Sequence, residues 1–163
     1  MSLTKTAKID IGISADNRQA VANTLNRILA DEFVLYTKTR KFHWNVQGIH
    51  FHDLHRFFES QYQELAEILD TVAERIRKIG HYTLGTLQQF LKETDLVEHI
   101  DDGSTAEVMV EALLADHETI IKEIRNALDT IEEKHKDAGT ADFLTGIMEQ
   151  HETMAWMLRS MLQ

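Results

Sequence analysis

The segment from Lys41 to His55 reads KFHWNVQGIHFHDLH and holds four histidines, and three carboxylates follow it at Glu59, Asp70 and Glu74. Imidazole nitrogen and carboxylate oxygen are the side-chain ligands that proteins offer to iron, manganese and zinc. The chain has no cysteine, so a thiolate site, a disulfide framework and a cysteine nucleophile are all excluded. These residue types favour a histidine–carboxylate site for iron, for manganese or for zinc.

The spacing of these residues predicts that the site is shared between subunits. His55 and Glu59 are four residues apart, as are Asp70 and Glu74, so each pair shares one face of a helix. From Glu59 to Asp70 the helix rises by about 16 Å, whereas a bond from a metal to nitrogen or oxygen measures about 2 Å. Two copies of this helix packed antiparallel would bring the pairs together, and His43 adds another nitrogen nearby.

The elements that must position these residues are long helices. The chain has no proline, and six of its seven glycines mark off four segments with apolar residues at helical period, covering residues 21–46, 54–76, 109–131 and 143–162. Only Gly146 falls inside a segment. The span 80–103 contains TLQQFLKE and predicts a short extra helix within a long crossover. We therefore expect an all-α, ferritin-like four-helix bundle with helices of about 22 to 34 residues, in which the crossover makes the middle helices parallel.

The chain organisation is that of one domain. We expect a short flexible tail over residues 1–13 and the bundle over residues 14–163. Ser104 and Glu107 form a predicted capping box at the third long helix, and Thr140 is the predicted N-cap of the fourth. No apolar run reaches the ~20 residues of a membrane span, and the first residues lack the apolar core of a secretory signal, so we expect a soluble intracellular protein.

Other histidines have simpler expected roles. The only Glu-x-x-His motif, Glu132 to His135, lies in a charged run, so the usual di-iron site inside a bundle is not predicted. His117 and His151 lie on apolar stripes, and we expect both to be buried and hydrogen-bonded. His81 follows the end of the second helix and is expected to face its dipole, with a ligand role as the alternative.

Three segments resemble the Dps family of mini-ferritins: KFHWNVQG, FHDLHRFFE and DTVAERIRKIG. The stretches TADFLTGIME and EQHETMAWMLRSML are similar to that family's fourth helix, so the resemblance extends over the whole chain. It implies a hollow dodecamer that oxidises Fe(II) at ferroxidase centres between subunits, preferably with hydrogen peroxide and alternatively with oxygen. The ferric product would be stored as oxide in the cavity, which would protect against oxidative damage.

The resemblance also implies a ligand set. His43 and His55 would come from one subunit, and Asp70 and Glu74 from its twofold partner. Glu59 stands where the family has Asp or Glu. Iron is the implied metal, and zinc is a possible substitute.

Further roles follow from the same resemblance. Trp44 would trap an oxidising equivalent, although a tryptophan at this place could also anchor a subunit interface. Asp137 and Asp142 would line an iron-entry pore at the threefold axes; as local features, both could equally be acids favoured by a helix N-terminus.

Two other functions compete with iron oxidation. The first is compaction of DNA in a bacterial nucleoid, with the iron site secondary; the second is a purely structural oligomer. The formal charge of −10 per chain opposes a polyanion, and Lys5 and Lys8 offer only a weak basic tail. The expected location is the bacterial cytoplasm, with no membrane contact.

Overall fold

The computed structural model of this protein describes residues 9–98 and 100–163. The described residues form five α-helices and one short π-helix, with no strand among them. The elements are α1 (Ala15–Asn45), α2 (Phe51–Lys78), α3 (Leu87–Glu93), α4 (Ala106–Asp129), η1 (Thr130–Lys134) and α5 (Ala138–Ser160). The predicted all-α class and the short extra helix are confirmed.

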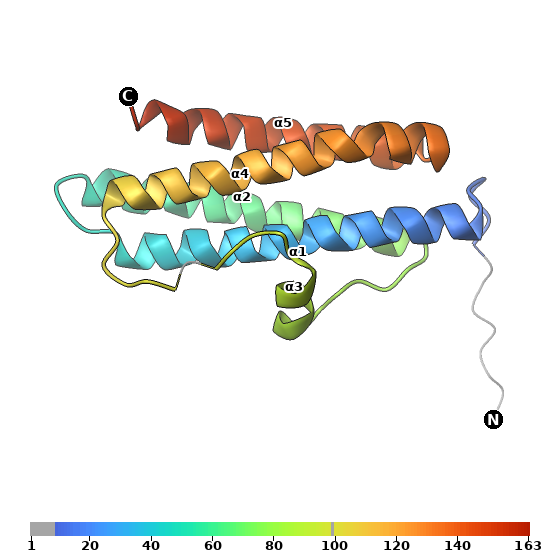
Figure 1. The fold of residues 1–163 in the computed structure, drawn as a ribbon, viewed down its shortest axis with the longest axis horizontal. Helices are drawn as coiled ribbons and strands as arrows, with labels where there is room; N and C mark the ends of the chain where they lie inside the picture. Colours follow the sequence, from blue (N-terminus) through green and yellow to red (C-terminus); the bar gives the residue numbers. More distant parts are fainter. Residues whose placement is uncertain (1–8, 99) are drawn as a thin grey trace.

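The four long helices make a bundle with one long crossover (Figure 1). Helices α1 and α2 form an antiparallel pair, and α4 and α5 form a second pair. The crossover returns along the bundle, so α4 starts at the same end as α2 and runs parallel to it (Figure 1). Helix α3 lies midway in the crossover beside α1, where the Phe33 and Phe90 rings stack with centroids 4.4 Å apart. The ferritin-like arrangement predicted from the crossover is therefore present.

Local signals set the start of α1 and the ends of α1 and α2, and both ends lie near glycines, as the sequence suggested. Ser14 caps α1 by accepting a hydrogen bond from a backbone amide at 3.2 Å. Gly48, with φ +106°, makes the turn between α1 and α2, and Gly80, with φ +93°, ends α2. The His81 amide then donates to the Ile76 carbonyl oxygen at 3.1 Å, a Schellman arrangement. His81 thus lies in the C-cap region, as predicted.

Both predicted N-caps of the later helices were wrong by one to three residues. The cap of α4 is Thr105, whose side chain accepts from the Val108 amide at 3.3 Å, and the Ser104–Glu107 capping box does not form the cap. The cap of α5 is Asp137, and Thr140 lies inside the first turn. A carboxylate can accept two hydrogen bonds here, so it replaces the hydroxyl as the cap.

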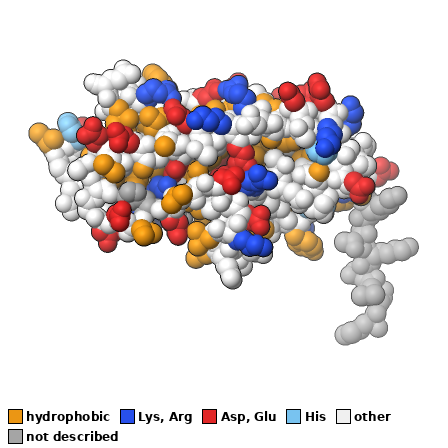
Figure 2. Space-filling model, viewed as in Figure 1, with side chains coloured by type: hydrophobic (Ala, Val, Ile, Leu, Met, Phe, Trp, Pro, Cys, Tyr) orange, Lys and Arg blue, Asp and Glu red, His pale blue; other side chains and the backbone are white. Residues whose placement is uncertain are grey.

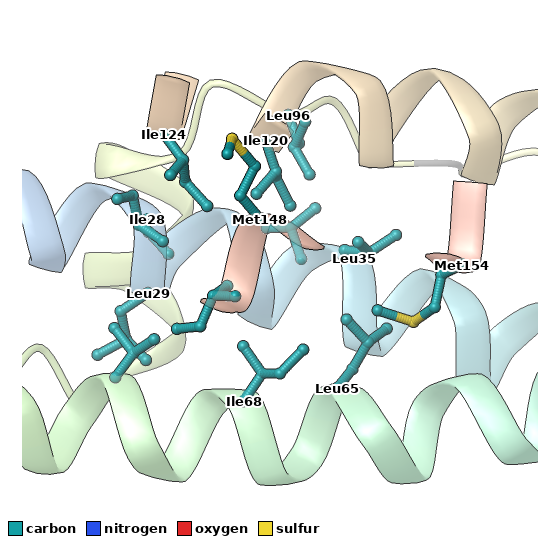
Figure 3. Close-up of a cluster of buried hydrophobic side chains, with 14 of the residues drawn as sticks. Ile28, Leu29, Leu35, Leu65, Ile68, Leu96, Ile120, Ile124, Met148 and Met154 are labelled. Carbon is teal, nitrogen blue, oxygen red and sulfur yellow. The ribbon is translucent and has the colours of Figure 1, made fainter. Parts of the chain in front are cut away.

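The core lies between the four long helices and is closed on one side by the crossover. Figure 3 shows side chains from all four of these helices meeting, with Leu96 of the crossover among them. Each fully buried aliphatic side chain contributes about 1.5–3 kcal/mol of transfer free energy. The labelled members are Ile28, Leu29, Leu35, Leu65, Ile68, Leu96, Ile120, Ile124, Met148 and Met154.

Polar groups also cross this core. Lys38 of α1 contacts Asp116 of α4 at 2.6 Å, nearly out of solvent. His117 and His151 are fully buried, their Nδ1 atoms lie 2.9 Å apart, and His151 Nε2 lies 2.7 Å from a Glu32 carboxylate oxygen. The predicted buried, hydrogen-bonded state of both histidines is confirmed. No described helix is both long enough and apolar enough to cross a bilayer.

Candidate metal centre

His43 and His55 are held together across the turn between α1 and α2. Their rings stack with centroids 3.8 Å apart and planes at 21°. His43 Nδ1 lies 2.7 Å from the His55 carbonyl oxygen, and His55 Nδ1 lies 2.8 Å from the His43 carbonyl oxygen. A carbonyl oxygen can only accept, so both Nδ1 atoms must carry the proton. In its neutral form each ring therefore has its lone pair on Nε2, which is the tautomer a metal ion needs.

A tyrosine that sequence reasoning missed adjoins this pair. The Tyr62 ring meets the His43 ring edge-on at 5.2 Å, and its hydroxyl donates to a Glu59 carboxylate oxygen at 3.4 Å. Burial, followed by the Glu59 charge, raises the pKa of the Tyr62 hydroxyl, so the phenol stays protonated and can orient Glu59. The only sequence signal was its position three residues after Glu59, on the same helical face.

The surface beside the histidines is apolar and exposed. The Trp44 side chain is 64% exposed, and the Arg40 guanidinium lies 5.3 Å from its ring centroid. Ile49 and Phe51, at the turn into α2, are also exposed. Aromatic and arginine side chains are enriched in the centres of protein interfaces. This surface, which follows His43 along the end of α1 and the turn into α2, is suited to contact with another protein surface.

The carboxylates Asp70 and Glu74 lie far along α2 from the histidines, and both are exposed. Glu74 makes a surface ion pair with Lys78, at 3.0 Å. From His55 to Asp70 the helix rises by about 22 Å. The structure of one chain therefore does not bring the five predicted ligands together, because the histidine pair bridges α1 and α2 while Asp70 and Glu74 lie farther along α2.

Among the described residues, one group of three candidate ligands has donor atoms within 4.8 Å of one another: Asp31, Asp95 and Glu123. It includes none of the predicted ligands and lies elsewhere in the fold.

The two predicted pore acids differ in their surroundings. Asp137 is 2% exposed, and its carboxylate accepts from Thr140 Oγ1 at 2.6 Å and from Arg75 Nη2 at 3.0 Å. Asp142 is exposed on the first turns of α5. The Asp137 carboxylate therefore caps a helix and pairs with an arginine, whereas Asp142 faces solvent. The pore role of both acids stays a prediction.

Other histidines that the structure describes have separate surroundings. The Glu132 side chain is exposed, and His135 Nδ1 lies 3.3 Å from Asn17 Oδ1. Burial, followed by the Arg18 charge, lowers the pKa of His81, which keeps its ring neutral. The expectation for the basic tail, with Lys5 and Lys8, lies outside the described residues.

Comparison with known proteins gives consistent matches. Residues 22–163 match the family model described as the ferritin-like domain. An uncharacterized low temperature-induced protein of Nostoc sp. is 45% identical over 156 residues, covering 96% of this chain and 87% of the relative. The DNA protection during starvation protein 2 of Bacillus anthracis is 40% identical over 146 residues, covering 90% of this chain and 98% of that protein.

A solved structure shows the same fold. The Dps protein of Vibrio cholerae O1, described as a member of a broad superfamily of ferritin-like diiron-carboxylate proteins, superposes with a TM-score of 0.90 at 29% identity. The match covers 99% of this chain and all of the Vibrio chain.

Proposed function

Because the chain belongs to the ferritin-like domain family and, within it, to the Dps proteins, we propose that it oxidises Fe(II) and retains the ferric product as oxide inside a hollow homododecamer. The observation that carries the proposal is the reciprocal hydrogen bonding of His43 and His55. It fixes two imidazoles beside each other, each with Nε2 available to a metal ion. A purely structural oligomer would have no need of this arrangement.

The centre would be completed by a twofold axis that pairs α2 helices antiparallel. Asp70 and Glu74 of the partner subunit would then face His43 and His55 of the first. Carboxylates stabilise the harder Fe(III), while imidazoles hold Fe(II) without trapping it. The apolar surface around Trp44 supports this pairing, because its burial between subunits would exclude water from the site.

The proposed reaction takes one electron from each of two Fe(II) ions. Hydrogen peroxide accepts both electrons and two protons, its O–O bond breaks, and two water molecules leave along with two Fe(III) ions. Delivery of both electrons at one site avoids release of a hydroxyl radical. Peroxide is the proposed oxidant and oxygen the alternative, while zinc competes with Fe(II) for the same nitrogen and oxygen atoms.

Other residues of this chain would assist the reaction. Glu59, oriented by Tyr62, would add an oxygen ligand on the histidine side. Trp44 would accept an oxidising equivalent that escapes the iron site, since Trp44 directly follows His43 in the sequence and its ring is exposed on the surface of the subunit. Fe(II) would enter through acidic pores that include Asp142. We place the activity in the bacterial cytoplasm.

DNA compaction is the second candidate, because the printed name of the Bacillus anthracis relative refers to DNA protection. The charge distribution opposes it: the chain carries −10, and on the face in Figure 2 the basic side chains are scattered among acidic ones. A mobility-shift titration over a salt series would show little retardation near physiological salt. A strong shift there would place DNA binding first.

The test of iron oxidation is anaerobic Fe(II) loading followed by a stoichiometric amount of peroxide, with ferric absorbance and a radical trap as readouts. Glu74→Gln should slow oxidation at least tenfold and leave the oligomer intact by size exclusion. Glu111→Gln, which changes an exposed acid on α4, is the matched control and should behave as the parent protein. Equal rates for both variants would remove Glu74 from the site.

A further inference from the structure

A carboxylate of α1 ties the crossover to the bundle. Asp31 is fully buried. Its Oδ1 accepts hydrogen bonds from Thr94 Oγ1 at 2.6 Å, from the Asp95 amide at 2.7 Å and from the Leu96 amide at 3.3 Å. These donors lie in the segment that follows α3 (Figure 1). Its other oxygen, Oδ2, is buried and makes no hydrogen bond to any residue that the structure describes.

A second unpartnered oxygen comes from α4. Glu123 Oε2 is also buried and likewise without a hydrogen-bond partner among the described residues. One carboxylate oxygen each from Asp31, Asp95 and Glu123 lies within 4.8 Å of the other two. Two oxygens that bind one calcium ion at about 2.4 Å lie at most about 4.8 Å apart. The three groups are therefore close enough to share one cation.

The charges of this cluster do not balance. Among the described residues, the guanidinium that pairs with this cluster is that of Arg27, with Nη1 4.0 Å from Asp95 Oδ2 and Nε 3.8 Å from Glu123 Oε1. Both distances exceed those of a direct hydrogen bond. With all three carboxylates ionised, the cluster and Arg27 leave two formal negative charges. The charge on Asp31, which is buried, and on Glu123, which is half-buried, is costly unless a counter-charge is present. A divalent cation supplies that counter-charge.

We propose that Asp31, Asp95 and Glu123 form a structural site for one hard divalent cation that fastens the crossover to α1 and α4. The donor set contains only oxygen, which suits Ca²⁺, Mg²⁺ or Mn²⁺ and sets this site apart from the histidine-containing centre on α2. Asp95 is exposed, so water can complete the coordination from that side. The site does not depend on the proposed ferroxidase function.

In the absence of a cation, the closeness of these carboxylates favours the protonated form of Glu123. Burial, followed by the neighbouring Asp31, raises the pKa of the Glu123 carboxyl to about 8. A proton is therefore the competing occupant, and the test must separate the two.

The experiment uses the intact oligomer stripped with chelator, with Ca²⁺ as the probe in calorimetric titration and thermal unfolding. We expect saturable binding of one Ca²⁺ per subunit and a rise in Tm of several degrees. Glu123→Gln should weaken this Ca²⁺ binding at least tenfold and abolish the rise in Tm. The fold should survive the substitution, because Oε2 of Glu123 makes no hydrogen bond to a described residue that the change would remove. Glu111→Gln on the same helix is the control and should keep both responses.

A crystal soaked in Mn²⁺ gives the direct location. An anomalous peak between Asp31, Asp95 and Glu123 would support the site. No peak there, or Ca²⁺ binding that is unchanged in Glu123→Gln, would overturn the proposal. A parent protein whose Tm depends on pH but not on Ca²⁺ would show that a shared proton fills the site, and would overturn it as well.

Discussion

His43 and His55 bind each other's backbone: Nδ1 of His43 lies 2.7 Å from the His55 carbonyl oxygen, and Nδ1 of His55 lies 2.8 Å from that of His43. The two bonds bridge the turn around Gly48, so the turn that reverses the chain also places the proton on Nδ1 of both rings. Carbonyl partners of this kind orient imidazoles at metal sites. The α1–α2 hairpin and the histidine pair are thus one structural unit.

His55→Asn separates these two roles. The asparagine amide can still donate to the His43 carbonyl, but it supplies no nitrogen where Nε2 was. We expect peroxide-driven Fe(II) oxidation, followed by stopped-flow absorbance, to slow at least tenfold, while urea denaturation shows a loss of about 1 kcal/mol or less. An unchanged rate would show that His55 is not a ligand.

Mixing two inactive variants should restore activity. A twofold interface repeats each contact, so a dimer of His55→Asn with Glu74→Gln contains one site with all ligands intact and one site with both mutations. Random mixing makes half of the dimers mixed, and activity should return to about a quarter of the parent value. Steady-state oxidation by refolded mixtures measures this. Mixtures no more active than either variant alone would contradict the shared site.

Tyr62→Phe should weaken metal binding without unfolding the protein. The variant keeps the ring against His43 but removes the hydroxyl that donates to Glu59 at 3.4 Å. Loss of a group that orients a ligand costs about tenfold or more in affinity. Anaerobic Fe(II) titration calorimetry is the measurement. Tyr82→Phe changes an exposed ring, and its affinity should equal that of the parent protein.

The buried histidine pair should make the fold sensitive to acid. Burial, followed by the nearby His151, lowers the pKa of His117 well below its ordinary value. Below pH about 6.5 the unfolded chain binds a proton at this residue that the native state does not. Stability is therefore full above that pH and falls as the pH decreases below it.

His117→Asn should flatten this dependence, because an amide does not titrate yet can still hydrogen-bond to His151. Urea unfolding between pH 5 and 8 at one fixed protein concentration tests it. The slope of stability against pH is the readout, since the smaller side chain lowers stability at every pH. A slope equal to that of the parent protein would assign the acid sensitivity to other groups.

Asp137 and Asp142 should separate into a structural and a transport role. Asp137→Ala removes the N-cap of α5 and leaves Arg75 without its carboxylate, so we expect a loss of about 1–3 kcal/mol in urea unfolding. Asp142→Asn should leave stability unchanged and slow oxidation only at low Fe(II), where entry limits the rate. Oxidation kinetics across Fe(II) concentrations would show this, and a slowing that is equal at every concentration would contradict an entry role.

The sequence by itself determined the parts of this protein that depend on local spacing. Helical period gave the four long helices, the glycines gave the turns at Gly48 and Gly80, and the length of the crossover gave parallel middle helices. The distance from Glu59 to Asp70 along one helix predicts a site divided between subunits. Each of these follows from repeats of a few residues along a single element.

Only the tertiary structure decided the contacts between elements. Asp31 and Glu123 lie on different helices, and their shared environment depends on how α1, α4 and the crossover pack, which hydrophobic period does not encode. The Asp137 carboxylate likewise pairs with Arg75, 62 residues away in sequence. The carbonyl bonds of His43 and His55 depend on the path of the turn between them. Long-range packing, rather than residue type, selected which polar atoms meet.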